Sequence, residues 1–187
     1  MDRKTHDLHP WLASLAEYGR RWPDEAGTVA LFTALAEAHD DAHAYRRERT
    51  EGHFTGSAWV VSADGRRTLL LHHRKLDRWL QPGGHADGDA DLARVALREA
   101  EEETGLRDLV VEGGVFDLDR HAIPARGAEA EHWHYDVRFV VRANGSEDFV
   151  LNEEANALAW REVADVALDP HADESVRRMA RKWLERR

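Results

Sequence analysis

The sequence predicts a protein of the α/β (α+β) class, because helical and strand patterns both occur along the chain. Residues 1–50 carry apolar side chains at helical spacing, whereas the apolar runs and alternation typical of strands begin at His53. A glycine loop then leads into a further helix at about Asp91. We therefore expect a core built from both helices and strands.

Composition limits the kinds of protein that this chain can be. Its 187 residues and 42% hydrophobic content suit one domain with an elaboration. There is no apolar run of transmembrane length and no signal-peptide pattern, so we expect a cytoplasmic protein without membrane contact. The absence of cysteine excludes disulfides and thiolate chemistry. A formal charge of -10 disfavours polymeric nucleic acid, but a small phosphorylated substrate remains compatible with it.

The first 50 residues predict two helices, Leu8–Arg21 and Asp24–Arg49, separated by Trp22 and Pro23. Their apolar residues look like ordinary packing faces, which is the interpretation we favour. A substrate rim or a homodimer contact remains open, because the sequence does not choose between them.

A β-hairpin follows, with strands at Ser57–Val61 and Thr68–His72 joined around Asp64-Gly65, a strong turn signal. The basic segment at residues 72–78 either contacts phosphate oxygens or is a solvated connection. Strands are also expected after residue 109. A C-terminal packing helix is expected over Asp173–Arg187.

Between the hairpin and the later strands, Leu80–Leu106 (LQPGGHADGDADLARVALREAEEETGL) combines a glycine loop with a short amphipathic helix. Residues 87–91 supply turn formers and an N-cap, and Gly105 is well placed to end the helix. Glu99, Glu102 and Glu103 fall on the apolar stripe, since residues seven apart share a helix face.

Carboxylates on an apolar stripe need a cation, because burying an unpaired one costs several kcal/mol. Oxygen ligands at i, i+3 and i+4 suit a hard ion such as Mg²⁺ or Mn²⁺, and Arg98 is placed to orient one carboxylate. The alternative is a solvated helix face whose glutamates pair only with arginine.

The complete spacing resembles the Nudix box, the signature of the Nudix hydrolases. It consists of Gly83-Gly84 followed at a fixed distance by Arg98-Glu99-x-x-Glu102-Glu103-x-Gly105-Leu106. The family's usual glutamate six residues after the second glycine is replaced here by Ala90, between Asp89 and Asp91. The resemblance implies the Nudix fold, a mixed sheet sandwiched between helices. It also implies a Nudix domain over residues 51–187 after an N-terminal helical extension over residues 1–50.

The same resemblance implies an enzyme, a pyrophosphohydrolase acting on phosphorus anhydrides. It would use Mg²⁺ or Mn²⁺ to hydrolyse a diphosphate linkage in a nucleoside diphosphate joined to another moiety. The implied catalytic residues are Glu99, Arg98 and Glu102, and the implied metal ligands are Glu99, Glu102, Glu103, Gly83 and Glu154. The alternative, motivated by Ala90, is a nucleotide-binding module on the same fold that senses its ligand without cleaving it.

A histidine pair lies in the late strand beginning near Glu131. Strand alternation puts His132, His134 and Asp136 on one face, and His121 is expected to approach the same region. The pair is open to three interpretations: pocket lining, zinc ligation, or a hydrogen-bonded pair without further function. Spacing provides no third zinc ligand, so pocket lining is the functional interpretation we favour.

Overall fold

The computed structural model describes residues 11–38, 41–127, 130–151 and 155–186. The chain forms two compact units. The first unit consists of Met1–Gly56, Gly84–Val95 and Gly114–Arg138, and the second of Ser57–Gly83, Ala96–Gly113 and Phe139–Arg187. Within the described residues, no helix has both the length and the apolar character needed to cross a membrane.

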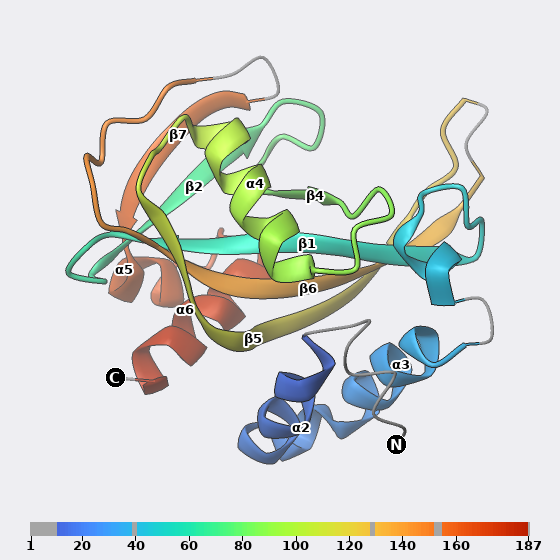
Figure 1. The fold of residues 1–187 in the computed structure, drawn as a ribbon. Coiled ribbons are helices and arrows are strands. Elements are labelled where there is room, and N and C mark those ends of the chain that lie inside the picture. Colours follow the sequence, from blue (N-terminus) through green and yellow to red (C-terminus); the bar gives the residue numbers. More distant parts are fainter. Residues whose placement is uncertain (1–10, 39–40, 128–129, 152–154, 187) are drawn as a thin grey trace. The chain divides into compact units, whose positions relative to one another are not determined.

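The N-terminal helices, α2 (Leu12–Arg21) and α3 (Ala26–Ala36), lie side by side, joined by the short 3-10 helix η1 (Pro23–Glu25) (Figure 1). The predicted start at Leu8 lies outside the described residues, and the predicted end at Arg21 is confirmed. The predicted continuation to Arg49 is wrong.

The second helix stops at Ala36, and the chain then forms the 3-10 helix η2 (Asp41–Tyr45). Tyr45 explains the change, because its ring packs 5.0 Å from that of Phe54 and its hydroxyl accepts a 3.2 Å hydrogen bond from Trp11. Burial of Tyr45 in this aromatic group therefore overrides the local helical pattern.

A seven-stranded sheet has the order β3-β2-β1-β6-β5, with β4 paired to β1 and β7 paired to β2. The strands are β1 (Gly52–Val61), β2 (Arg67–His73), β3 (Arg78–Leu80), β4 (Gly83–His85), β5 (Leu109–Ile123), β6 (His132–Ala143) and β7 (Ala155–Glu162). The predicted hairpin is confirmed, since β1 and β2 are antiparallel with Val61 opposite Thr68 and Gly65 adopts a φ of 66°. The α+β class with a mixed sheet is confirmed as well. The domain boundary after residue 50 stays a prediction.

Helix α4 (Leu92–Thr104) has the ends that the sequence predicts. At its start the Asp91 carboxylate accepts a 3.1 Å hydrogen bond from the Arg94 amide. At its end Gly105 adopts a φ of 69° and its amide donates to the Glu101 carbonyl. The predicted apolar stripe is fully buried, at Leu92, Val95, Ala96 and Ala100.

In the second unit, α5 (Val163–Leu168) and α6 (Glu174–Arg186) pack against each other (Figure 1). Val176, Met179 and Trp183 form the buried side of α6, and the Trp183 indole donates a 2.8 Å hydrogen bond to the Gly65 carbonyl. The C-terminal helix is thus confirmed up to Arg186, and Arg187 lies outside the described residues. This helix anchors the hairpin turn between β1 and β2.

Candidate functional site

Glu103 is the most enclosed of the predicted ligands that the structure describes, with only 8% of its surface exposed. Its carboxylate accepts a 2.9 Å hydrogen bond from the backbone amide of Gly83, at the start of β4. A Cβ at Gly83 would lie only 2.1 Å from the Ser57 hydroxyl oxygen and 2.9 Å from its Cα. Only glycine therefore fits here without a shift of the backbone, and the loop backbone is held directly against the carboxylate.

Glu99 lies one helical turn before Glu103 and is held by Arg98, whose Nη2 is 2.8 Å from the Glu99 Oε1 atom. The Glu99 side chain is 16% exposed, so it too faces inward. Glu102 was predicted to lie on the apolar stripe, but its side chain is 64% exposed. Its carboxylate lies 4.0 Å from the Arg98 guanidinium. Two carboxylates thus face inward and the third lies at the solvent edge.

This group of side chains fits a hard divalent cation. Its side-chain donors are carboxylate oxygens, which Mg²⁺ and Mn²⁺ prefer. Arg98 pairs with Glu99 and lies 4.0 Å from the Glu102 carboxylate, so a single guanidinium is shared by two of the three carboxylates. The ligand roles of Glu99, Glu102, Glu103 and Gly83 stay predictions, as does the positioning role of Arg98.

The two aspartates beside Ala90 already have partners. Asp89 forms a bidentate pair with the Arg94 guanidinium, at 2.6 and 2.8 Å. Asp91 caps α4 and lies 3.7 Å from the same guanidinium. Each aspartate therefore has a structural role that is independent of any metal ion.

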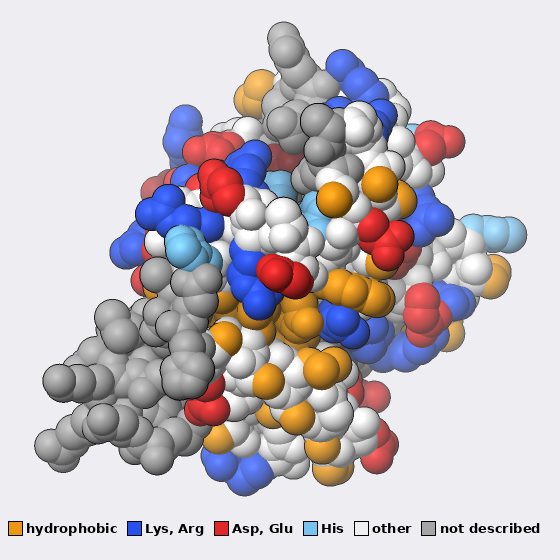
Figure 2. Space-filling model, turned by 90° about the vertical axis from the view of Figure 1, so that its right-hand side faces the viewer, with side chains coloured by type: hydrophobic (Ala, Val, Ile, Leu, Met, Phe, Trp, Pro, Cys, Tyr) orange, Lys and Arg blue, Asp and Glu red, His pale blue; other side chains and the backbone are white. Residues whose placement is uncertain are grey.

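Three histidines of the first unit converge where β1 and β6 begin. His53, His132 and His134 each offer a ring nitrogen, and these atoms lie within 4.8 Å of one another. The Nε2 atoms of His132 and His134 are 3.2 Å apart. His53 and His132 are buried, with 1% and 5% of their surface exposed. Figure 2 shows pale-blue histidine side chains on one face of the molecule, among charged and hydrophobic ones.

Two further histidines surround this group. The rings of His85 and His121 lie 5.0 and 5.4 Å from that of His134, so the expected approach of His121 is confirmed. Asp136, which alternation placed on the same face as His132 and His134, accepts hydrogen bonds from Thr55 and Arg138. It therefore belongs to a neighbouring ion-pair network.

Burial keeps the central imidazoles neutral. Burial, together with the neighbouring His85 and His53, lowers the pKa of His134 from 6.5 to about 2. Burial also lowers the pKa of His53 from 6.5 to about 4. Both rings are therefore neutral at pH 7, the form in which imidazole ligates metals.

Sequence analysis identified the His132–His134 pair but missed His53. Alternation along one strand places His132 and His134 on the same face, whereas His53 comes from a strand far earlier in the chain. The adjacency of β1 and β6 in the sheet brings it to the pair. Its only signal in the sequence was its position at the start of a predicted strand.

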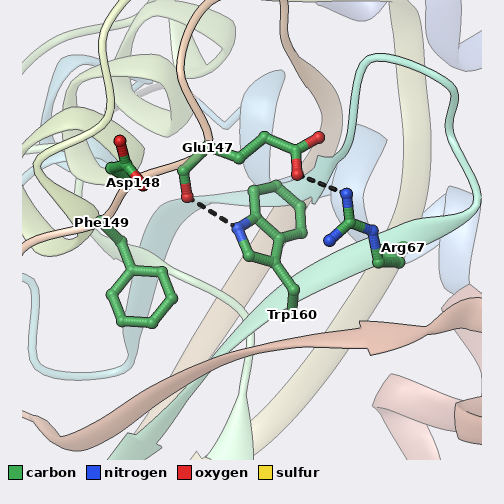
Figure 3. Close-up of a pocket in the computed structure, with 5 residues that line it drawn as sticks. All are labelled: Arg67, Glu147, Asp148, Phe149 and Trp160. Carbon is green, nitrogen blue, oxygen red and sulfur yellow. Dashed lines mark hydrogen bonds and ion pairs between the residues drawn. The ribbon is translucent and has the colours of Figure 1, made fainter.

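The second unit contains a pocket of about 420 Å³ that the sequence did not indicate. Figure 3 shows its lining residues, which are Arg67, Glu147, Asp148, Phe149 and Trp160. The Trp160 indole donates a 3.0 Å hydrogen bond to the Glu147 carbonyl, and Arg67 pairs with the Glu147 carboxylate. The arginine that lines this pocket is therefore already paired. Glu154, the ligand predicted before Trp160, lies outside the described residues.

Comparison with known proteins places these features in a family. Residues 53–183 match the family model described as NUDIX domain. "Putative 8-oxo-dGTP diphosphatase 3" of Mycobacterium tuberculosis is 34% identical over 117 residues, which are 57% of this chain and 51% of that protein. The "CMP-5'-(N-acetyl-N-hydroxy-3-aminopropyl)phosphonate hydrolase" of Streptomyces rubellomurinus is 37% identical over 98 residues, 44% of this chain and 48% of that protein.

The chain thus spans about half the length of the curated relatives it matches. Among solved structures, the E. coli dihydroneopterin triphosphate pyrophosphohydrolase is similar with a TM-score of 0.59 and 17% identity. The match covers 72% of this chain and 96% of that one. At this level of identity the likeness concerns the fold.

Proposed function

The chain belongs to the Nudix hydrolase family, and from this premise we propose that it hydrolyses a diphosphate linkage in a nucleoside diphosphate joined to another moiety. Two relatives support a nucleotide substrate, since their names specify 8-oxo-dGTP and a CMP-linked phosphonate. The net charge of -10 favours such a small molecule over polymeric nucleic acid. We also propose a cytoplasmic location; a homodimer remains open.

One observation supports the proposal most strongly: the buried Glu103 carboxylate is held by the Gly83 amide, one turn from Glu99. Such an arrangement fixes two inward carboxylates on a rigid helix next to a loop that only glycine can form. It keeps the carboxylate positions defined before any ligand binds, which lowers the cost of assembling the site.

In the proposed mechanism, Glu99, Glu102 and Glu103 hold a divalent cation together with the Gly83 carbonyl and Glu154. Bound Mg²⁺ or Mn²⁺ supplies charge neutralisation at the diphosphate oxygens and a lower pKa for the attacking water. Glu99 either completes the ligand set or accepts the proton of that water. Arg98 holds the Glu99 carboxylate at 2.8 Å and so restricts its orientation.

Turnover of a substrate panel by Glu103→Gln tests this proposal. The panel contains 8-oxo-dGTP, a nucleotide sugar, ADP-ribose, a dinucleoside polyphosphate and a CMP-linked phosphonate, each with Mg²⁺, Mn²⁺ or chelator. We expect metal-dependent cleavage by the wild type and a loss of more than roughly 100-fold in the variant, because an amide is a weaker cation ligand.

Glu101→Gln is the matched control, since it removes an equal charge from the same helix at a position outside the proposed ligand set. It should keep turnover within about twofold of the wild type. Full activity of Glu103→Gln would contradict the proposed site. Equal losses in both variants would indicate a general effect of helix charge.

A nucleotide-binding module without hydrolysis is the second candidate, favoured by one observation. The usual box glutamate is replaced by Ala90, and the flanking aspartates are engaged by Arg94 and the start of α4. Calorimetry with the same panel distinguishes the two functions. Binding of a nucleotide without cleavage under any metal condition would favour the sensor.

A further inference from the structure

The histidine cluster, defined as His53, His132 and His134, has the donor geometry of a metal site. Each ring contributes one nitrogen, all within 4.8 Å of one another, and the rings come from the first residues of two adjacent strands. Nothing in the proposed hydrolysis uses these residues. We propose that the cluster binds Zn²⁺ through three imidazole nitrogens, as a site distinct in its ligands and its metal from the box carboxylates.

The spacing between two of the rings matches tetrahedral zinc. Zinc–imidazole bonds of about 2.0–2.1 Å at tetrahedral angles put the ligand nitrogens roughly 3.3 Å apart. In the structure a hydrogen bond joins the Nε2 atoms of His132 and His134 at 3.2 Å, a separation that two zinc ligands would also have. The ligand nitrogen of His53 lies within 4.8 Å of both and would have to move closer to reach that separation.

Backbone carbonyls fix the tautomers of two of the three rings. His132 Nδ1 lies 2.9 Å from the Ala130 carbonyl, and His53 Nδ1 lies 3.3 Å from the Arg49 carbonyl. A carbonyl only accepts hydrogen bonds, so each Nδ1 carries the proton and each Nε2 presents a lone pair. Such backbone contacts behind a ligating histidine are typical of metal sites.

One atom of the cluster, the Nε2 nitrogen of His53, is unsatisfied. This atom is buried and has no hydrogen-bond partner among the described residues. A buried nitrogen lone pair without a donor is unfavourable, and a bound cation would satisfy it.

A carboxylate network adjoins the cluster. Asp119 contacts His121 at 3.1 Å, and the His121 ring lies 5.4 Å from that of His134. The same aspartate joins a buried group in which Arg138 pairs with the carboxylates of Asp117, Asp119 and Asp136.

The donor type selects the metal. Imidazole nitrogen suits zinc and other late first-row ions, whereas Mg²⁺ requires oxygen. Three protein ligands leave one position of a tetrahedral ion for water or a further ligand, and the His85 ring is 5.2 and 5.0 Å from those of His53 and His134. Zinc at this position would tie the start of β1 to the start of β6.

Metal content of the full chain tests the proposal. Chelator-treated protein is equilibrated with Zn²⁺ in excess Mg²⁺, which occupies oxygen sites, and bound zinc is measured by mass spectrometry after desalting. We expect one zinc per chain. His53→Asn and His132→Asn should lower zinc affinity more than tenfold, because asparagine can replace the Nδ1–H donor but not the Nε2 ligand.

Two controls separate this site from other sources of zinc binding. His171→Ala removes an exposed histidine of the second unit and should leave zinc affinity unchanged. Glu103→Gln should also retain zinc. The zinc proposal and the hydrolase proposal are therefore tested independently. Zinc lost in Glu103→Gln but kept in the histidine variants would place the ion at the carboxylates and overturn the proposal.

Spectroscopy of the wild type covers the case in which a variant does not fold. Co²⁺ in the cluster should give the intense visible absorption of a four-coordinate ion, and added Zn²⁺ should abolish it. Long-range ¹H–¹⁵N spectra should show Zn²⁺ shifting the ring nitrogens of three histidines. Absence of stoichiometric zinc, or unchanged histidine resonances, would mean that the three rings form only a hydrogen-bonded cluster.

Discussion

The box carboxylates and the histidine cluster present opposite chemistry to a cation. Glu99 and Glu103 are anionic oxygen donors on one helix, held by Arg98 and by the Gly83 amide. The histidines are neutral nitrogen donors, brought together by neighbouring strands and fixed from behind by backbone carbonyls. Two sites with such different donors should differ in metal preference, pH response and sensitivity to mutation.

The difference also concerns how each site tolerates the absence of a metal. The carboxylates remain next to a guanidinium and a backbone donor, so their charge is partly compensated. In the cluster, burial instead lowers the pKa of His53 and of His134, so these two rings stay uncharged at pH 7. As the pH falls, we therefore expect the histidine cluster to be affected before the carboxylates.

Acidification should produce the largest effect on stability. The pKa of His53 is about 4 in the folded chain and 6.5 in the unfolded one, so the unfolded state binds more protons between these values. The stability that the folded chain gains from keeping His53 neutral is fully present above pH 6.5 and is lost as the pH falls towards 4. The loss in the free energy of unfolding is on the order of 3 kcal/mol. Urea unfolding of chelator-treated protein at several pH values measures this loss.

The pH profile has its own control. His53→Asn cannot titrate and should reduce the loss of stability in acid, leaving the share that comes from His134, while His171→Ala should reproduce the wild-type curve. If stability stayed constant from pH 7 to pH 4, the neutral buried state of His53 would be disproved. Added Zn²⁺ should raise the melting temperature at pH 7 and lose this effect in acid, since protonated imidazole does not ligate.

Gly83→Ala should give the next largest effect, confined to the carboxylate site. The new Cβ would lie 2.1 Å from the Ser57 hydroxyl oxygen and 2.9 Å from its Cα, so the loop must shift away from Glu103. We expect a stability loss of roughly 1–3 kcal/mol and a fall in turnover of more than about tenfold.

Gly27→Ala is the matched control, because a Cβ there meets nothing within 4 Å in the helix α3. It should be neutral or stabilise the chain by up to about 1 kcal/mol. Unfolding curves and steady-state kinetics of both variants measure the contrast. Similar behaviour of the two alanines would show that close approach at Gly83 does not matter for the site.

Ala90→Glu should give the smallest effect. It restores the glutamate usual in the box at a position where Asp89 and Asp91 are held by Arg94. We expect a few-fold tighter Mg²⁺ binding, measured by the metal dependence of turnover, and no change in zinc affinity. Unchanged Mg²⁺ dependence would mean that a neighbouring carboxylate already fulfils this role; Ala90→Gln controls for size.

The sequence by itself determined the family, the hairpin, helix α4 and its caps, and the final helix. These features depend on contacts within a few residues, such as the Asp91 cap and the turn at Gly65, so local periodicity and turn chemistry report them directly. The box carboxylates could be predicted for the same reason, because one helix carries all three.

Only the tertiary structure decided the end of α3, the exposure of Glu102 and the histidine cluster. Tyr45 leaves the helical pattern to pack on Phe54, a residue of another element. His53 joins His132 because two strands far apart in the chain are neighbours in the sheet. Strand pairing brings residues together at separations that no local pattern encodes, and this is the physical reason why the sequence revealed two of the three histidines as a pair and not the third.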